Sequence, residues 1–149
     1  MSGAGTPGGR VLAVDLGSRR IGLALSDPSR TIASPLLVLE RSRSAGDDHA
    51  AILAVARERE VATIVVGLPL SLSGRAGPAA KAAEAEIGAL AEAAGAELAV
   101  VAFDERLTTV SAQRSLRAAG VAGRNQRTMV DKVAAAIMLQ AFLDREAGA

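Results

Sequence analysis

Acidic residues occur at three places in the sequence where neither a turn nor a helix cap requires a carboxylate. Asp15 ends the apolar run Arg10–Asp15, Asp104 and Glu105 end a second apolar run, and Asp131 lies in an apolar setting near the C-terminus. In open α/β sheets, sites form beyond the carboxyl ends of the strands, and acids from neighbouring strands meet there. We therefore treat these acids as candidates for one shared site.

Grouped carboxylates repel one another, and a bound cation relieves that repulsion. Oxygen ligands of this kind suit Mg²⁺ or Mn²⁺. Two such ions about 4 Å apart can activate water and stabilise the leaving oxygen in phosphodiester hydrolysis. This chemistry needs neither cysteine nor histidine. The chain has no cysteine and one histidine, His49, which disfavours thiolate zinc sites, cysteine nucleophiles and serine triads. We expect His49 at the surface, near a helix start.

The same acids have a simpler interpretation, because an aspartate at a strand end most often forms a turn or caps a helix. Asp131 could equally serve the dipole of its own helix. Basic residues near the acids are candidate phosphate contacts, although each alone is typical of a solvated surface charge. They are Arg19, Arg20, Arg106, Arg124, Arg127 and Lys132.

Composition narrows the classes of function. The 149 residues are 50% hydrophobic and 22% charged, which fits one ordinary globular domain. Aromatic residues make up 1% of the chain, too few for the stacking platforms that bind single-stranded nucleic acid. The net charge of +1 means that any attraction to nucleic acid is local. We expect a disordered lead-in over residues 1–9, one domain over 10–149, no membrane span and a cytoplasmic location.

The elements that would position the acids alternate in type. Apolar runs predict strands, periodic apolar stripes predict helices, and Pro35 favours an edge position for the third strand. This order predicts an α/β fold with a mixed five-stranded sheet: an antiparallel meander of three strands, then parallel strands, with helices on both faces. The predicted strands are 10–15, 21–26, 31–39, 61–67 and 97–104, and the predicted helices are 47–60, 78–94, 107–120 and 128–146, with loops over 68–77 and 121–126.

Four segments together resemble the YqgF/RuvX family. Asp15–Asp27 resembles the opening motif of that family, and Val65–Gly74 is similar to its second motif. Asp104–Thr109 matches the third, and Val130–Ala135 with the following Leu-Gln pair is similar to the fourth. The resemblance covers nearly the whole chain beyond its Gly-rich start, and four motifs in register are specific.

The resemblance implies a single RNase H-like domain with nuclease activity that depends on Mg²⁺ or Mn²⁺. Family members are described as nucleases that mature the 5′ end of pre-16S rRNA, and as Holliday junction resolvases. The acidic triad of the family falls on Asp15, Glu105 and Asp131, which leaves a supporting role for Asp104. Many members carry a denser basic run before the last motif, so a partner or a second copy of the chain could supply further contact with nucleic acid.

Four functions remain open from the sequence. A nuclease could act on pre-16S rRNA in ribosome biogenesis, or on a Holliday junction in DNA recombination, which predicts a symmetric homodimer. The Asp-Leu-Gly-Ser turn also resembles the phosphate loop of actin-like kinases, but these close two domains around ATP. The last alternative is a non-catalytic adaptor that binds nucleic acid.

Overall fold

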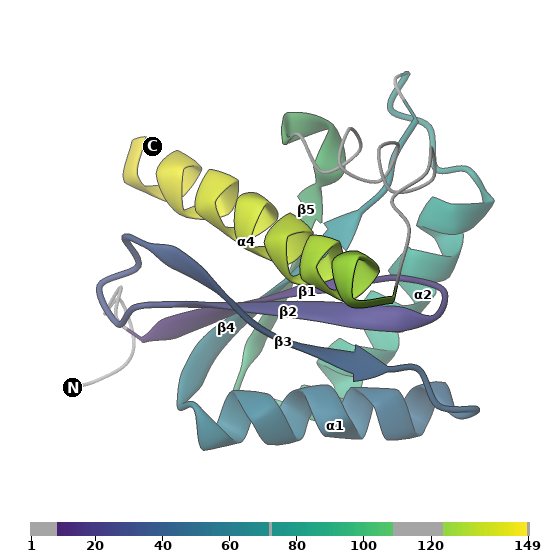
Figure 1. Cartoon of the computed structure of the whole chain (residues 1–149), viewed down its shortest axis with the longest axis horizontal. Coiled ribbons are helices and arrows are strands. Elements are labelled where there is room, and N and C mark those ends of the chain that lie inside the picture. The colour runs from purple at the N-terminus through teal and green to yellow at the C-terminus, as the bar shows by residue number, and fades with distance from the viewer. Residues whose placement is uncertain (1–8, 72, 109–123, 149) are drawn as a thin grey trace.

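The structure, a computed structural model, describes residues 9–71, 73–108 and 124–148. Within them a five-stranded sheet lies between helices on both faces (Figure 1), in the strand order β3-β2-β1-β4-β5. The elements are β1 (Arg10–Leu16), β2 (Arg20–Ser26), β3 (Ala33–Glu40), α1 (Ala45–Glu58), β4 (Val61–Leu68), α2 (Pro78–Ala94), β5 (Ala99–Asp104), the 3₁₀ helix η1 (Glu105–Leu107) and α4 (Arg124–Gly148).

The first strand, β1, is the centre of the sheet. It pairs antiparallel with β2 and parallel with β4, while β3 and β5 pair with the outer sides of β2 and β4. Five consecutive residues of β1, from Val11 to Asp15, are buried, as a strand covered on both faces requires. Because β1, β4 and β5 run in parallel, their carboxyl ends lie at the same edge of the sheet.

Successive side chains of a strand point to opposite faces, so the sheet has two cores. Leu12 and Val14 join the core beneath α1 and α2, whereas Val11 and Ala13 join the core beneath α4. The long α4 crosses that second face against β1, β2 and β3 (Figure 1). The alternation places Asp15 on the α4 face.

The predicted fold class is confirmed. The first two strands form the expected hairpin, the third takes the edge, and the later strands add in parallel. Helix α1 begins at Ala45, two residues before its predicted start, because Ser44 caps it: the Ser44 side chain accepts a hydrogen bond from the backbone nitrogen of Asp47.

The predicted boundaries toward the C-terminus are partly wrong. Helix α4 begins at Arg124, inside the loop predicted over 121–126, because arginine and glutamine are good helix formers even without an apolar pattern. The predicted helix 107–120 lies almost entirely outside the described residues, and so do residues 1–8 of the expected lead-in. No helix in the described ranges is long and apolar enough to cross a membrane.

Candidate active site

Asp15 lies at the carboxyl end of the central strand β1, and the residue beside it in each adjacent strand is a glycine. Its paired residue in β2 is Gly22. On the other side, Val14 pairs with Val66 of β4, so the next step in the register brings Gly67 beside Asp15. Since neither neighbour has a side chain, the α4 face of the sheet is open around the Asp15 carboxylate.

The other two acids of the predicted triad occupy the space above these glycines. A Cβ atom on Gly67 would overlap Oε2 of Glu105. A Cβ atom on Gly22 would overlap the backbone oxygen of Asp131 and lie 3.5 Å from its Cβ atom. The glycines are thus needed for close approach, and the three acids gather on one face at the carboxyl edge of the sheet.

All three acids are buried, and Asp131 forms an ion pair with Arg20. Asp15, Glu105 and Asp131 are 4%, 2% and 4% exposed. Arg20, the first residue of β2, donates from Nε to Oδ2 of Asp131 at 2.6 Å. This ion pair joins the β1–β2 turn to α4. It offsets one of three like charges that are costly to bury together.

The donor set fits a hard divalent cation. Three buried carboxylates offer the oxygen ligands that Mg²⁺ and Mn²⁺ prefer. In the conformation described, no three Asp, Glu, His or Cys side chains of the described residues are grouped closely enough to hold one ion. Arg20 already binds one oxygen of Asp131, so a shared ion would require side-chain rotation. The acids therefore fit a divalent metal in their chemistry and burial, and a shared ion would draw their side chains closer together.

Asp104 differs from its neighbour Glu105, because β5 ends at Asp104 and Glu105 begins η1. Its Oδ1 accepts from the backbone nitrogen of Arg106 at 2.9 Å and so caps η1. Its carboxylate also accepts from the Arg106 guanidinium at 2.5 to 3.0 Å. These side-chain bonds lower the pKa of Asp104 below its ordinary value, although burial opposes them. Asp104 thus holds the short helix in which Glu105 is the first residue.

A small open cavity adjoins the triad at the β1–β2 turn. Its volume is about 160 Å³, and both Arg19 and Arg20 line it. A group that enters this cavity would contact Asp131, the third acid of the triad. The full lining consists of Gly17, Ser18, Arg19, Arg20 and Asp131.

The other predicted phosphate contacts are more dispersed. Arg106 is exposed and forms an ion pair with Asp104. Its guanidinium lies close to Gly74 in the β4–α2 connection. Lys132 follows Asp131 on α4 and is half-buried. The backbones of Arg124 and Arg127 belong to the start of α4, but their side chains lie outside the described ones.

The prediction that His49 lies at the surface is wrong. His49 is 5% exposed, and its Nε2 lies 2.8 Å from Oε1 of Glu86 in α2. His49 precedes Ile52 and Leu53 by three and four residues, so it shares the buried side of α1 with them. That helical spacing is the signal in the sequence that identifies a buried histidine.

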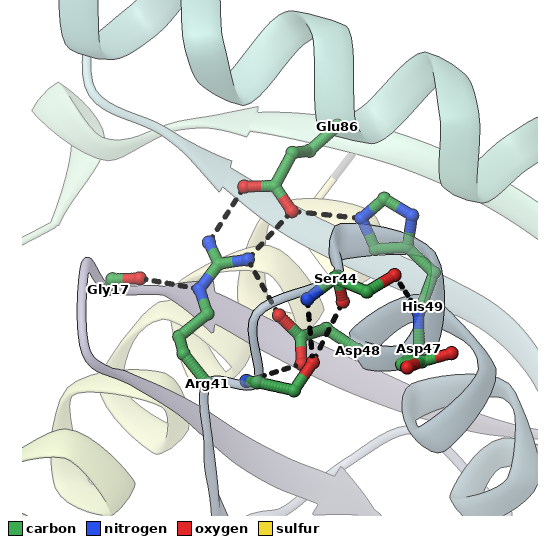
Figure 2. A network of polar contacts seen from close by, with 8 residues as sticks. Gly17, Arg41, Ser44, Asp47, Asp48, His49 and Glu86 are labelled. Carbon is green, nitrogen blue, oxygen red and sulfur yellow. Dashed lines mark hydrogen bonds and ion pairs between the residues drawn. The ribbon is translucent and has the colours of Figure 1, made fainter.

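Glu86 belongs to a polar cluster between the sheet edge, α1 and α2 that the sequence analysis missed (Figure 2). Its four members, which we call the Arg41 cluster, are Arg41, Asp48, His49 and Glu86. Arg41 binds both oxygens of Glu86, at 2.9 and 2.7 Å. This bidentate bond is the largest of several contacts that lower the pKa of Glu86, while burial opposes them. No local sequence pattern predicts the Arg41–Glu86 pair, because Arg41 directly follows β3 and Glu86 lies in α2, 45 positions later.

Comparison with known proteins relates the chain to a family along most of its length. The RuvX family model, described as Holliday junction resolvase, matches residues 9–145. A protein of Clavibacter michiganensis subsp. michiganensis, provisionally named a pre-16S rRNA nuclease, is 49% identical over 95% of this chain and 86% of its own length. A similarly named protein of Mycobacterium sp. strain KMS is 48% identical over 99% of this chain and 87% of its own.

Solved structures share the fold at much lower identity. Thermus thermophilus RuvC in complex with a Holliday junction substrate superposes with a TM-score of 0.56 at 18% identity, over 94% of this chain and 97% of that one. A second T. thermophilus RuvC structure gives 0.55 at 19%, over 93% and 96%. This likeness shows the RNase H-like fold. Because the family model spans nearly the whole chain and relatives share about half of its residues, the chain belongs to the RuvX family.

Proposed function

We propose that the protein is a divalent-metal-dependent endonuclease that hydrolyses phosphodiester bonds in pre-16S rRNA. The observation that carries the proposal is the set of three buried carboxylates, Asp15, Glu105 and Asp131, gathered from distant segments over two glycines. Membership of the RuvX family supports nuclease chemistry, and the provisional names of the relatives supply the substrate.

Each acid has a part in the proposed reaction. Bound Mg²⁺ or Mn²⁺ would supply an activated water and charge stabilisation for the leaving oxygen. Asp15 and Glu105 would hold the ion, and Asp131 would complete the ligand set or orient the attacking water. Burial of the carboxylates excludes bulk water and strengthens every charge interaction at the scissile phosphate.

The proposed substrate contacts are charged rather than aromatic. Arg19 and Arg20 line the cavity beside Asp131, where they can bind phosphates next to the cleaved bond. Further phosphate contacts extend along η1 and the start of α4. RNA would be recognised by its backbone and 2′-hydroxyls, because the chain has only two aromatic residues. The residues of this outer set are Arg106, Arg124, Arg127 and Lys132.

The proposal extends to the domain boundaries, cellular location and oligomeric state of the protein. Residues 10–149 form the nuclease domain and residues 1–9 precede it as a lead-in. Action on rRNA places the protein in the cytoplasm. The description of the family model favours a second candidate function, cleavage of Holliday junctions. A resolvase must cut two strands, so that function requires a homodimer with two sites.

One cleavage assay tests both candidates. A pre-16S rRNA fragment and a four-way DNA junction are each incubated with Mg²⁺ or Mn²⁺ and with wild-type protein, Asp15→Asn or Asp144→Asn. Asp144 is an exposed acid at the far end of α4 and serves as the control. We expect metal-dependent RNA cleavage that falls at least about 100-fold in Asp15→Asn, because misplaced reacting groups lose that much, and that persists in Asp144→Asn.

Circular dichroism of Asp15→Asn tests whether the variant keeps the wild-type fold. Paired symmetric nicks in the junction, with intact RNA, would establish the resolvase function instead. Undiminished cleavage by Asp15→Asn, or no cleavage of either substrate by the wild type, would refute the nuclease site.

A further inference from the structure

The Arg41 cluster contacts the β1–β2 turn at Gly17 (Figure 2). We propose that Arg41 is a positioning residue of the active site, which fixes the turn Gly17–Arg20 and thereby places the Arg20 guanidinium on Asp131. The inference rests on the proposed nuclease function of the triad and deepens it by assigning a residue that does not touch the substrate.

Arg41 holds the turn at two backbone oxygens. Its own backbone nitrogen donates to the oxygen of Arg19 at 2.8 Å. Its Nε donates to the oxygen of Gly17 at 2.9 Å. The turn is closed by a third bond at 2.9 Å, from the nitrogen of Gly17 to the oxygen of Arg20. The backbone from which Arg20 reaches Asp131 is therefore tied on both sides.

The Arg41 guanidinium is itself held in place. Glu86 accepts from Nη1 and Nη2 at 2.9 and 2.7 Å, and Asp48 accepts from Nη1 at 3.4 Å. His49 lies 2.8 Å from the Glu86 oxygen that Nη1 binds. A planar fork bound bidentately resists rotation more than a single contact does. All three guanidinium nitrogens have acceptors within the protein, so this arginine positions the turn and is not a phosphate ligand.

A purely structural role, in which Arg41 only docks α1 and α2 on the sheet, makes different predictions. Arg30 is a matched control for that role. Its Nε donates to the backbone oxygen of Gly9 at 3.0 Å, its Nη2 to Thr63 at 3.0 Å, and its Nη1 pairs with Glu146 at 3.3 Å. The two arginine side chains are almost equally exposed, 16% and 17%, but Arg30 serves the opposite end of the sheet.

The decisive measurement observes the Arg20–Asp131 pair without any activity. Arginine Nε–H resonances are recorded in ¹H–¹⁵N spectra of the whole protein, and the Arg20 signal is assigned by its loss in Arg20→Lys. We expect the signal to shift or disappear in Arg41→Met and to stay in place in Arg30→Met. An unchanged Arg20 signal in folded Arg41→Met overturns the proposal. If Arg41→Met does not fold, Glu86→Gln, which removes a charged anchor at constant size, is judged by the same criterion.

Kinetics give a second readout that a structural role would not move. We expect kcat to fall about tenfold in Arg41→Met, a loss typical of groups that orient active-site residues. Adding Arg41→Met to Arg20→Met should cause no further loss of kcat, because both changes break the same link. A full additional tenfold loss in the double variant would overturn the proposal. An inactive wild type would instead refute the nuclease function, while the Arg20 resonance still decides the positioning role.

Discussion

Gly22 and Gly67 flank Asp15 in neighbouring strands, and the other two acids of the triad lie directly over them. Glycine inside a strand weakens packing and loses more chain entropy on folding than alanine does, about 0.5–1 kcal/mol. A strand interior would therefore favour a larger residue at both positions. The structure gives the reason for glycine here, since the space of a methyl group is occupied by carboxyl and backbone atoms of the site.

Gly67→Ala should destabilise the fold by about 1–3 kcal/mol, because the new methyl group overlaps Glu105 and approaches Met138 within 2.8 Å. Gly88→Ala is the control, because Gly88 is exposed in α2 with nothing within 4 Å of a new Cβ atom. That change should stabilise the protein by up to about 1 kcal/mol. Urea unfolding compares the two, and a Gly67→Ala protein as stable as the wild type would show that the site has room to spare.

Arg20→Met should tighten the binding of Mn²⁺ in the absence of nucleic acid. The change removes the hydrogen bond from Arg20 Nε to Oδ2 of Asp131 and makes the site more negative by one charge. We expect a gain on the order of tenfold, which corresponds to about 1.4 kcal/mol. Calorimetry measures the affinity, with Arg19→Met as control, since that exposed neighbour has no ion pair with the triad among the described residues. Weaker or unchanged binding would mean that Arg20 does not compete with the metal.

At the scale of elements, the sequence is informative wherever burial follows a local period. The apolar runs of β1 and β4 predict central strands, and Pro35 predicts the edge strand. These features depend on residues a few positions apart, so they can be read without the structure.

Other features depend on contacts between distant segments. The Arg20–Asp131 pair spans 111 positions and the Arg41–Glu86 pair spans 45, and neither leaves a local pattern. The placement of three acids over two glycines likewise requires the strand register. The triad could be named from family resemblance, but its charge compensation could not.

The Arg41 cluster makes the docking of α1 and α2 dependent on pH. Hydrogen bonds from Arg41 lower the pKa of Glu86 below its ordinary 4.5, with burial opposing. The folded protein then binds the Glu86 proton less readily than the unfolded chain. The stabilisation is therefore present above pH 4.5 and is lost as the pH falls through that value toward the folded pKa.

Glu86→Gln should thus lower the free energy of unfolding by about 1–2 kcal/mol at neutral pH, because a charged hydrogen-bond partner is lost. The difference from the wild type should shrink as the pH falls below 4.5. Urea unfolding between roughly pH 3 and 7, the range in which the Glu86 carboxyl changes charge, measures this difference. Glu84→Gln, at an exposed position of the same helix, is the control, and a pH-independent difference for Glu86→Gln would contradict the expected linkage.

At the scale of the whole molecule, charge is nearly balanced at +1, so the proposed binding to RNA would depend on a few local contacts. Replacement of one arginine that contacts a phosphate reduces the slope of log affinity against log salt by about 0.7 to 0.9. Arg19→Met should show this change, measured by fluorescence anisotropy in the Asp15→Asn background so that the RNA stays intact. Arg59→Met, an exposed arginine after α1, should leave the slope unchanged. Equal slopes for both variants would place Arg19 outside the RNA interface.

The three acids come from positions 15, 105 and 131, and the last of them is delivered by α4. A growing polypeptide contains the first acid early and the second only after all five strands have been synthesised. The third joins them only when α4 docks across the completed sheet (Figure 1). During synthesis the three acids are consequently not together until α4, which completes the second core, has docked, so the proposed nuclease activity would begin only after that step.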